Sequence, residues 1–410
     1  GEEEHGSVRL PRSAGGKGRR EADEANKPAE VEAIEAFLLS QAEFRHNVIT
    51  HHCEIRWTEE AGFLPLTDRD VNTLWGRMNK TVGRVYLTDI YNVIHSEFVP
   101  LFNPFQSYFD HLPSWDGVSD PIGDLADTVH VKSDQAEFRD YFRKWFVGIL
   151  PALLDDTVVN HEILVLIGEQ GLYKTTWFNF LLPPELRCYF YTKTNSDRLN
   201  KDDLFSLTEF ALICFEELDG MRPAELNQLK AMVTMPYVNE RAAYGRNKER
   251  HPHIASFCGT GNNVQFLTDP TGNRRWLPFE VSQIRDPHLH AIPYELVYSQ
   301  AYALWKSGFC HWFSQEEIRK LNMHNSRFEV PNLEEDLIRT HFRKPFEGEA
   351  GIFVTAADIL EQISSCLRYP LSPNKIGRIM AGLEFESIRY KGKRGYITVK
   401  KTGEDIDRER

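Results

Sequence analysis

The sequence predicts an α/β protein, and three apolar runs carry that prediction. Residues 163–167 and 211–215 are apolar at consecutive positions, and residues 254–258 are apolar except for Ser256, as expected for strands that are buried on both faces of a sheet. A polar or glycine-rich segment follows each run, and a helical pattern follows the first of these segments. We therefore expect a sheet with polar groups at the ends of its strands.

The segment after the first run has the form of a phosphate-binding loop. Gly168 and Gly171 allow the backbone to turn sharply and approach a phosphate chain. We expect Lys174 to contact the terminal phosphates of ATP and Thr175 to hold Mg²⁺. A helix that begins near Lys174 directs its positive end at the anion. The expected nucleotide site comprises Gly168, Gln170, Gly171, Tyr173, Lys174, Thr175 and Thr176.

One position departs from the usual pattern of such loops. Tyr173 stands where a glycine usually precedes the lysine. A phosphate cradle often needs a positive φ at that position, and a tyrosine adopts it at a greater cost than a glycine does. The alternative interpretation is a strand–turn–helix corner that binds no nucleotide.

The second apolar run ends in acidic residues. Beside a bound nucleotide, one acid coordinates Mg²⁺ and the next polarises the attacking water as a general base. We assign Glu216 to the metal and Glu217 to the base, with Asp219 as a rival for either role. A solvated acidic turn is the alternative.

The third apolar run leads into a turn rich in Asn and Gly over residues 259–263. At the end of a central strand, the amide of Asn262 can orient a water molecule against the γ-phosphate, and Asn263 is the next choice. Further along, Arg274 and Arg275 are adjacent in a turn. In a ring ATPase, one of them enters the neighbouring subunit's site and stabilises charge that develops on the γ-phosphate. A plain surface pair is the alternative.

The ordered motifs GEQGLYKTT, ICFEELDG, LKAMVT, ERAAYGRN, GTGNN and DPTGNRRW resemble those of the virulence-associated E family. The resemblance covers roughly residues 102–313, and Tyr173 departs from it because the family usually has glycine there. Proteins of this family are similar to superfamily-three helicases of phages and mobile elements. The resemblance implies an AAA+-like P-loop NTPase core that forms a ring, as a hexamer, on single-stranded or forked DNA. It also implies an upstream primase domain in a longer chain, or a primase partner.

The same resemblance implies a hairpin that faces the central channel, between the acidic strand and the strand before Asn262. Arg241, Tyr244, Arg246 and Lys248 fall in this interval. Basic side chains there can follow a phosphate backbone, and Tyr244 can stack on a base. A solvated basic loop, or a role for Arg241 at the nucleotide site, is the alternative.

Two regions precede the ATPase region. Residues 1–28 are polar and charged, and we expect a disordered linker or tail. Residues 29–150 are expected to be mainly helical, with helices that begin near residues 29, 67 and 88. An apolar, aromatic helix over 138–154 is typical of a core. A histidine and cysteine cluster in this region lacks the spacing of a metal site; it comprises His46, His51, His52 and Cys53.

Residues 151–325 form the expected ATPase domain, and the composition changes after Trp312. Residues 326–402 show three helical patterns and then two alternating strands around Gly392 and Gly395, which predicts a winged-helix domain. A winged helix used for protein contacts is the alternative to one that binds DNA. Residues 403–410 are expected to be a tail. The expected DNA-binding residues of this domain are Lys375, Arg378, Arg389, Lys391, Lys393 and Arg394.

Composition sets further bounds on the protein. The chain has 410 residues, of which 41% are hydrophobic, so two or three domains with ordinary cores can form. No apolar run is long enough to span a bilayer and no signal peptide is recognisable, so we expect a cytoplasmic protein without a membrane partner. The six cysteines form no CxxC pair and are expected to be reduced, without zinc. The net charge of −12 argues mildly against a general DNA coat but does not exclude local basic surfaces.

Together these patterns predict an ATP-dependent DNA helicase or translocase that acts as a ring in the replication of a phage or mobile element. Thr175 and Glu216 are expected to bind Mg²⁺. The first alternative is a catalytically weakened protein that acts as a DNA-binding assembly scaffold, and the second is a phage-defence ATPase. The expected catalytic residues are Lys174, Glu216, Glu217, Asn262, Arg274 and Arg275.

Overall fold

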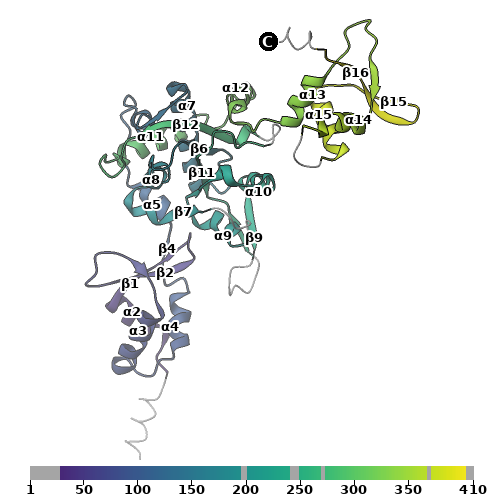
Figure 1. Ribbon diagram of the computed structural model, residues 1–410. Coiled ribbons are helices and arrows are strands. Elements are labelled where there is room, and N and C mark those ends of the chain that lie inside the picture. Colours follow the sequence, from purple (N-terminus) through teal and green to yellow (C-terminus); the bar gives the residue numbers. More distant parts are fainter. Residues whose placement is uncertain (1–27, 195–200, 241–248, 269–272, 367–370, 403–410) are drawn as a thin grey trace, which may run out of the picture. The chain divides into compact units, whose positions relative to one another are not determined.

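A computed structural model of the chain has a mixed α/β architecture, as the sequence predicts (Figure 1). It describes residues 28–194, 201–240, 249–268, 273–366 and 371–402. The chain divides into two compact units. The first takes in Gly1–Val264 and Gly272–His324, and the second Gln265–Thr271 and Asn325–Arg410. The expected tails at 1–27 and 403–410 lie outside the described residues.

A six-stranded sheet forms the centre of the first unit, in the order β5-β12-β6-β11-β8-β7. Five neighbouring strands run parallel, and β5 joins the edge antiparallel to β12. The sequence predicts β6, β8 and β11, and the structure adds the other three. The strands are β5 (Val129–Val131), β6 (Ile163–Ile167), β7 (Phe190–Lys193), β8 (Leu212–Phe215), β11 (Ser256–Gly261) and β12 (Trp276–Ile284).

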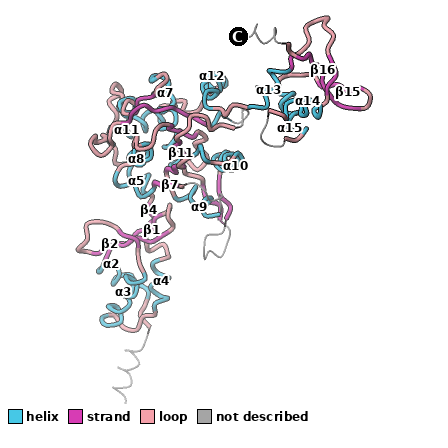
Figure 2. The backbone as a smooth tube through the Cα atoms, in the orientation of Figure 1, coloured by secondary structure: helices cyan, strands magenta, loops and turns pink. Residues whose placement is uncertain are grey.

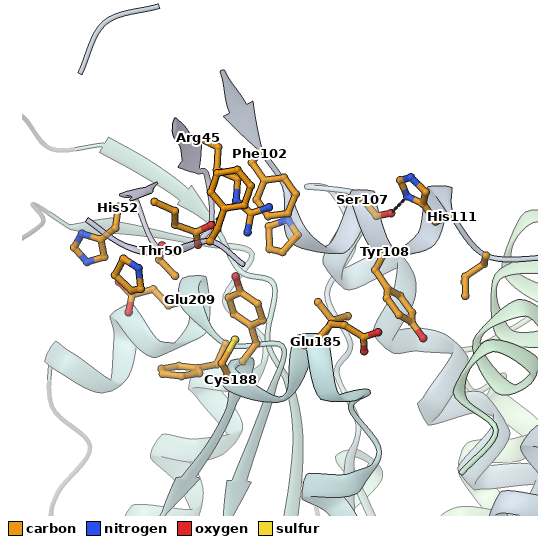
Figure 3. A pocket seen from close by; sticks show the side chains of 18 of the residues that line it. Arg45, Thr50, His52, Phe102, Ser107, Tyr108, His111, Glu185, Cys188 and Glu209 are labelled. Atoms are coloured by element: carbon orange, nitrogen blue, oxygen red, sulfur yellow. Dashed lines mark hydrogen bonds and ion pairs between the residues drawn. The ribbon is translucent and has the colours of Figure 1, made fainter. Parts of the chain in front are cut away.

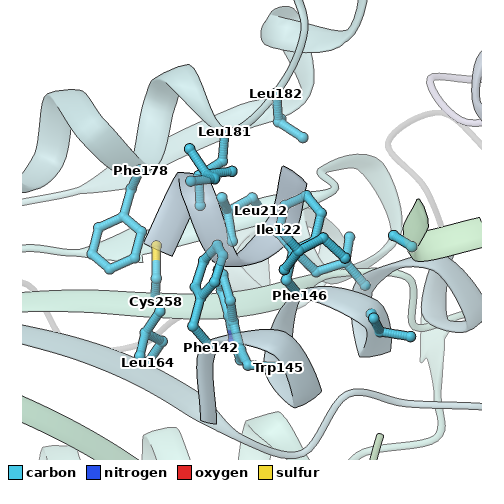
Figure 4. Close-up of a cluster of buried hydrophobic side chains, with 14 of the residues drawn as sticks. Ile122, Phe142, Trp145, Phe146, Leu164, Phe178, Leu181, Leu182, Leu212 and Cys258 are labelled. Carbon is cyan, nitrogen blue, oxygen red and sulfur yellow. The ribbon is translucent and has the colours of Figure 1, made fainter. Parts of the chain in front are cut away.

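Helix α7 (Gln135–Leu154) carries the aromatic stripe expected from the sequence, and that stripe is part of the core. Phe142, Trp145 and Phe146 are fully buried beside residues of α8 and of the strands (Figure 4). The Trp145 indole also donates a hydrogen bond to the Phe257 carbonyl of β11, at 2.9 Å. The other helices of this region are α5 (Pro104–Asp110), α6 (Pro121–Ala126), α8 (Lys174–Phe180), α9 (Lys201–Glu209), α10 (Pro223–Val233), α11 (Tyr294–Lys306) and α12 (Gln315–Asn325).

Residues 29–102 form a module with its own core, made of three helices and a small sheet. The predicted helix after Thr67 is confirmed, because the Thr67 side chain accepts from the Asp70 amide while the Asp70 carboxylate accepts from the Thr67 amide. The sequence analysis missed the sheet. The elements are α2 (Val31–Gln41), α3 (Asp68–Thr81) and α4 (Leu87–Ile94), with strands β1 (Ala42–Asn47), β2 (His52–Trp57), β3 (Leu64–Pro65) and β4 (Leu101–Phe102) in the order β3-β2-β1-β4.

A two-stranded hairpin lies between the acidic strand and β11, as the family resemblance implies. Strand β9 (Tyr237–Glu240) pairs antiparallel with β10 (Glu249–Pro252). The four candidate DNA contacts that follow β9 in the sequence, Arg241, Tyr244, Arg246 and Lys248, lie outside the described residues. Only the base of the hairpin is therefore defined.

The described residues of the second unit form three helices and a small antiparallel sheet (Figure 2). The sequence predicts the three helices and the β15–β16 hairpin, and the structure adds β13 and β14. Thr355 and Ser372 cap the second and third helices through hydrogen bonds to the third helical amide. An apolar cluster joins all three helices to the sheet. The elements are α13 (Leu333–His341), α14 (Ala356–Ser364), α15 (Pro373–Gly382), β13 (Phe342–Arg343), β14 (Ile352–Val354), β15 (Ser387–Tyr390) and β16 (Lys393–Lys400).

None of the helices described in the structure has both the length and the apolar character needed to cross a membrane. All six cysteines are free thiols, and Cys214 and Cys258 are buried in β8 and β11. Within the described ranges, no group of three His, Cys, Asp or Glu side chains is arranged to hold a metal ion.

Candidate functional site

The candidate phosphate loop lies at the carboxyl end of β6, between that strand and α8. Gly168 is required by a close approach, because a Cβ atom there would lie 2.9 Å from the Val281 carbonyl oxygen. Gly171 has a φ of +88°, which L side chains rarely adopt. These two glycines allow the chain to leave the central strand and turn sharply into the helix.

Tyr173 adopts the left-handed conformation that a glycine usually supplies at this position. Its φ is 61° and its ψ is 18°, and it is the N-cap residue of α8. This conformation costs an L residue about 1–2 kcal/mol. The side chain is 41% exposed, at the wall of the pocket in front of the loop. The loop therefore keeps its cradle form despite the substitution.

Lys174 and Thr175 both make hydrogen bonds within the loop region. The Lys174 ammonium donates to the carbonyl oxygens of Gly168 and Glu169, both at 2.7 Å. Burial lowers the pKa of Lys174, and the charge of Asp219 opposes that shift. The Thr175 hydroxyl donates to Glu216 Oε1 at 2.8 Å. A hydroxyl and a carboxylate oxygen so close together are suitable ligands for Mg²⁺.

The three acidic residues after β8 have different surroundings. Glu216 is half-buried beside Thr175, whereas Glu217 is exposed and has a φ of 54°. Asp219 accepts hydrogen bonds from the backbone amides of Asn262 and Asn263, both at 3.1 Å, and from Asn263 Nδ2 at 2.7 Å. Asp219 therefore holds the turn after β11.

The loop, the acids and the β11 turn line one pocket of about 430 Å³. Most of the predicted nucleotide-site and catalytic residues are among its lining residues. Sequence analysis missed Leu172, Thr260 and Gly261, since their place in the wall depends on β11 lying next to β6. The lining comprises Gln170, Gly171, Leu172, Tyr173, Lys174, Thr175, Thr176, Glu216, Glu217, Thr260, Gly261 and Asn262.

Arg274 and Arg275 lie at the opposite end of the sheet from this pocket. They belong to the short turn Asn273–Arg275 that precedes β12, and Trp276 pairs with Ile163 at the start of β6. The phosphate loop follows the other end of β6, so the two ends are separated by roughly 15 Å at about 3.3 Å per strand residue. The two arginines therefore do not join the pocket of their own chain.

Glu162 occupies the same end of the sheet, one residue before β6. Burial raises the pKa of its carboxyl group to about 7, and the positive charges of Lys144 and Arg275 oppose that rise. Arg274 is exposed and Arg275 is half-buried.

A second, larger cavity of about 760 Å³ lies between the N-terminal module and the core of the first unit (Figure 3). The Arg45 guanidinium lies 3.6 Å from the centre of the Phe102 ring and forms an ion pair with Glu54. None of the residues predicted for the nucleotide site lines this cavity. We place the candidate site in the smaller pocket, because the groups gathered there match phosphate and metal chemistry.

The basic residues of the second unit gather on the β15–β16 hairpin. Tyr390 pairs with Lys393 across a two-residue turn in which Lys391 and Gly392 have φ values of 48° and 78°. Arg389, Lys391, Lys393 and Arg394 are all exposed.

Two further predicted DNA contacts lie on α15, and their surroundings differ. Arg378 is exposed. Lys375 forms an ion pair with the buried carboxylate of Glu334 on α13, so its charge is compensated within the unit.

Comparison with known proteins identifies one family. The profile of the virulence-associated protein E-like domain matches residues 110–330, which is more than half of the chain. A search of curated proteins finds no match. Solved structures of the apo NrS-1 C terminal region (305-718) are similar at TM-scores of 0.47 and 0.45. Their sequence identities are 12% and 13%, and in both cases 90% of this chain and 99% of the other are covered.

Proposed function

The chain belongs to the virulence-associated protein E-like family, and from this premise we propose that it is an ATP-dependent DNA helicase or translocase. In this proposal it acts as a ring in the replication of a phage or mobile element. One observation carries the proposal: a lysine, a threonine, two acids and an amide reach the same pocket from three neighbouring strands of a parallel sheet.

The strand order supports a P-loop NTPase core. Strand β6 leads to the glycine loop, β8 leads to the acids, and β11 lies between them and leads to Asn262. In open α/β sheets, ligands bind beyond the carboxyl ends of the strands. This order brings a metal-binding acid and a water-orienting amide to one side of a phosphate chain.

The residues present fit Mg²⁺ and ATP. Gly168 and Gly171 form a cradle without side chains, and the positive end of α8 faces it. Lys174 would exchange its two loop carbonyls for phosphate oxygens, and Thr175 with Glu216 would hold the metal. Bound Mg²⁺ supplies positive charge that stabilises the phosphoryl group during transfer.

Two residues are assigned to the attacking water. Glu217 is exposed at the pocket wall, where its carboxylate accepts the water's proton as general base. Asn262 orients the water from the adjacent strand. Asp219 holds the Asn262 turn by hydrogen bonds, so we assign it neither the metal nor the base role.

The location of the arginine pair supports the proposal of a ring. Arg274 and Arg275 are at the far end of the sheet from their own pocket. In the proposed ring they enter the pocket of a neighbouring copy, where positive charge stabilises the transferring phosphoryl group. We propose a hexamer.

The second unit supports the DNA-binding part of the proposal. Its order of helices and strands fits a winged helix, with α15 as the recognition helix and the β15–β16 hairpin as the wing. The exposed cations of the hairpin are suited to the phosphate backbone of duplex or forked DNA. We give Lys375 a lesser role, because Glu334 pairs with it.

The test of the enzyme is steady-state ATP hydrolysis with and without single-stranded DNA. Lys174→Ala should lower DNA-stimulated hydrolysis about 100-fold or more, because it removes a charge that stabilises the transition state. The matched control is Lys320→Ala, which removes an exposed lysine paired with Glu316 and should leave the rate unchanged. DNA-stimulated hydrolysis that persists in Lys174→Ala would contradict the proposal.

A DNA-binding assembly scaffold is the second candidate function. The Tyr173 side chain at the pocket wall and the hydrogen bonds of the Lys174 ammonium to its own loop favour it, because both features oppose phosphate entry. If this function is correct, calorimetry will detect no ATP binding to the wild type while DNA binding is intact. Tyr173→Gly should then restore nucleotide binding. Tight ATP binding by the wild type would eliminate the scaffold.

A further inference from the structure

The N-terminal module carries another pocket, distinct from the two described above, of about 420 Å³ on one face of α3. Its walls are formed by two aromatic rings that lie on different segments of the chain. Trp75 belongs to α3 and is 43% exposed, and Tyr86 precedes α4 and is 47% exposed. We call this surface the Trp75–Tyr86 shelf; it is lined by Asn72, Trp75, Asn79, Arg84, Val85, Tyr86 and Leu87.

The indole of the shelf is fixed by hydrogen bonds. Trp75 Nε1 donates to the Val85 carbonyl at 2.9 Å, so the polar edge of the ring is turned into the protein. Asn79 holds the same turn from both sides, since its Nδ2 donates to Val85 O at 3.1 Å and its Oδ1 accepts from Val85 N at 3.0 Å. An exposed aromatic ring with so little freedom loses little entropy when a ligand stacks on it.

Arg84 brings positive charge to the lining of the shelf, although the chain as a whole has a net charge of −12. Over residues 68–89 the sequence has four basic residues, Arg69, Arg77, Lys80 and Arg84, and three acids, Asp68, Asp70 and Asp89. The Arg84 guanidinium lies 5.0 Å from the centre of the Tyr86 ring. Basic side chains interleaved with aromatic rings are the features by which proteins hold single-stranded nucleic acid.

We propose that the Trp75–Tyr86 shelf binds single-stranded nucleic acid, with bases stacked on Trp75 and Tyr86. Arg84 and Lys80 contact the flanking phosphates, and the exposed amide of Asn72 faces a base edge at the pocket wall. This site is separate from the hairpins assigned to DNA above. It shares the nucleic-acid partner with the proposed function but does not depend on ATP hydrolysis.

The test measures binding of a fluorescent oligothymidylate to the full chain by anisotropy, without nucleotide and at low salt. Trp75→Ala should weaken binding about 10-fold, because each stacked base contributes substantially to affinity. Trp75→Phe should stay within about threefold of the wild type, since a ring is retained. The matched control is Trp312→Ala, which removes a tryptophan that is 55% exposed elsewhere on the first unit and should leave binding unchanged.

A second variant protects the test against a folding defect. Asn72 is exposed on α3, so Asn72→Asp should fold normally while its negative charge weakens oligonucleotide binding several-fold at low salt. Wild-type affinity in both Trp75→Ala and Asn72→Asp would overturn the inference. A change in oligomeric mass with unchanged affinity per protomer would also overturn it, because the shelf would then be a contact between copies.

The outcomes also separate this inference from the proposed function. Lys174→Ala abolishes hydrolysis in the proposed function, but it should bind the oligonucleotide as the wild type does. A wild type that binds no oligonucleotide would overturn both the shelf and the DNA role. A wild type that binds while the shelf variants bind equally well would overturn the shelf alone.

Discussion

Two residues of the candidate site have backbone conformations that favour glycine. Tyr173 has a φ of 61° and Glu217 a φ of 54°, and each follows the end of a buried strand. Such conformations cost about 1–2 kcal/mol each, and strained residues of this kind concentrate at functional sites. Tyr173 lines the pocket, and Glu217 leads the chain into the short turn that contains Asp219.

Glu162 offers a test of burial at the scale of a single side chain. Its pKa is raised to about 7 by burial, above the value of the unfolded chain. A raised pKa means that the folded state binds the carboxyl proton more tightly than the unfolded state does. The contribution of this proton to the free energy of unfolding is therefore complete below about pH 4.5 and is lost as the pH rises through 7.

The free energy of unfolding of the wild type should therefore fall between about pH 5 and 8, and this fall should be smaller in Glu162→Gln. The difference should be up to about 3 kcal/mol, because a shift of one pKa unit corresponds to about 1.4 kcal/mol. Urea unfolding at several pH values measures the effect. Glu32→Gln, at an exposed position of α2, is the control and should follow the wild type. Parallel stability curves for Glu162→Gln and the wild type would show that the carboxyl is not perturbed.

At the scale of elements, one link connects β8 and β11. Asp219 accepts three hydrogen bonds from the turn that carries Asn262. A Cβ atom at Gly261 would lie 3.0 Å from Asp219 Oδ1, so a larger residue there would press against this carboxylate. The position of Asn262 therefore depends on the acidic segment of the neighbouring strand.

Asp219→Ala should lower the kcat of ATP hydrolysis about 10-fold or more while changing KM less than about threefold, because it displaces a group that acts on the water rather than on the nucleotide. Hydrogen exchange at the amides of Asn262 and Asn263 should become faster. Asp219→Asn keeps one acceptor oxygen and should be intermediate. Asp156→Ala, at an exposed acid, is the control. Unchanged exchange at both amides would refute the link.

The sequence revealed those elements whose residues follow a simple pattern. Strands β6 and β8 are continuous apolar runs, β11 begins in a run that is apolar except for Ser256, and α7 has a clear stripe. Strand β12 contains Pro278, which argues against a strand interior, and β7 has only four residues, all half-buried. The β1–β2 hairpin carries charged and histidine side chains that conceal its alternation.

The candidate site was predictable for a similar reason. The sequence predicts which residues follow each strand, but it does not predict which strands are neighbours in the sheet. The wall formed by Thr260 depends on strand order, and so does the distance of Arg274 from its own pocket. Local patterns specify which side chains end a strand, whereas the sheet order arises from packing over the whole domain.

At the scale of the whole molecule, Lys174 lies at one end of the sheet and the arginine pair at the other. If neighbouring copies complete each other's sites, as in the proposed ring, two defective variants should restore activity when they are mixed.

Lys174→Ala and the double variant Arg274→Ala/Arg275→Ala should each be inactive alone. An equal mixture should recover about a quarter of the wild-type rate, because about one interface in four joins an intact loop to an intact arginine pair. ATP hydrolysis of the mixture measures this recovery. A mixture as inactive as its components would contradict completion between copies.

One short segment constrains how the molecule can be divided experimentally. Residues 265–271 belong to the second unit, although they are flanked on both sides by the first. Phe266 and Leu267 are buried, and their amides donate to the Phe328 carbonyl. Cutting the chain after His324 would therefore uncover both side chains only a few positions from Asn262 and Arg274. A truncated protein that loses ATPase activity would for that reason say nothing about what the removed half contributes to catalysis.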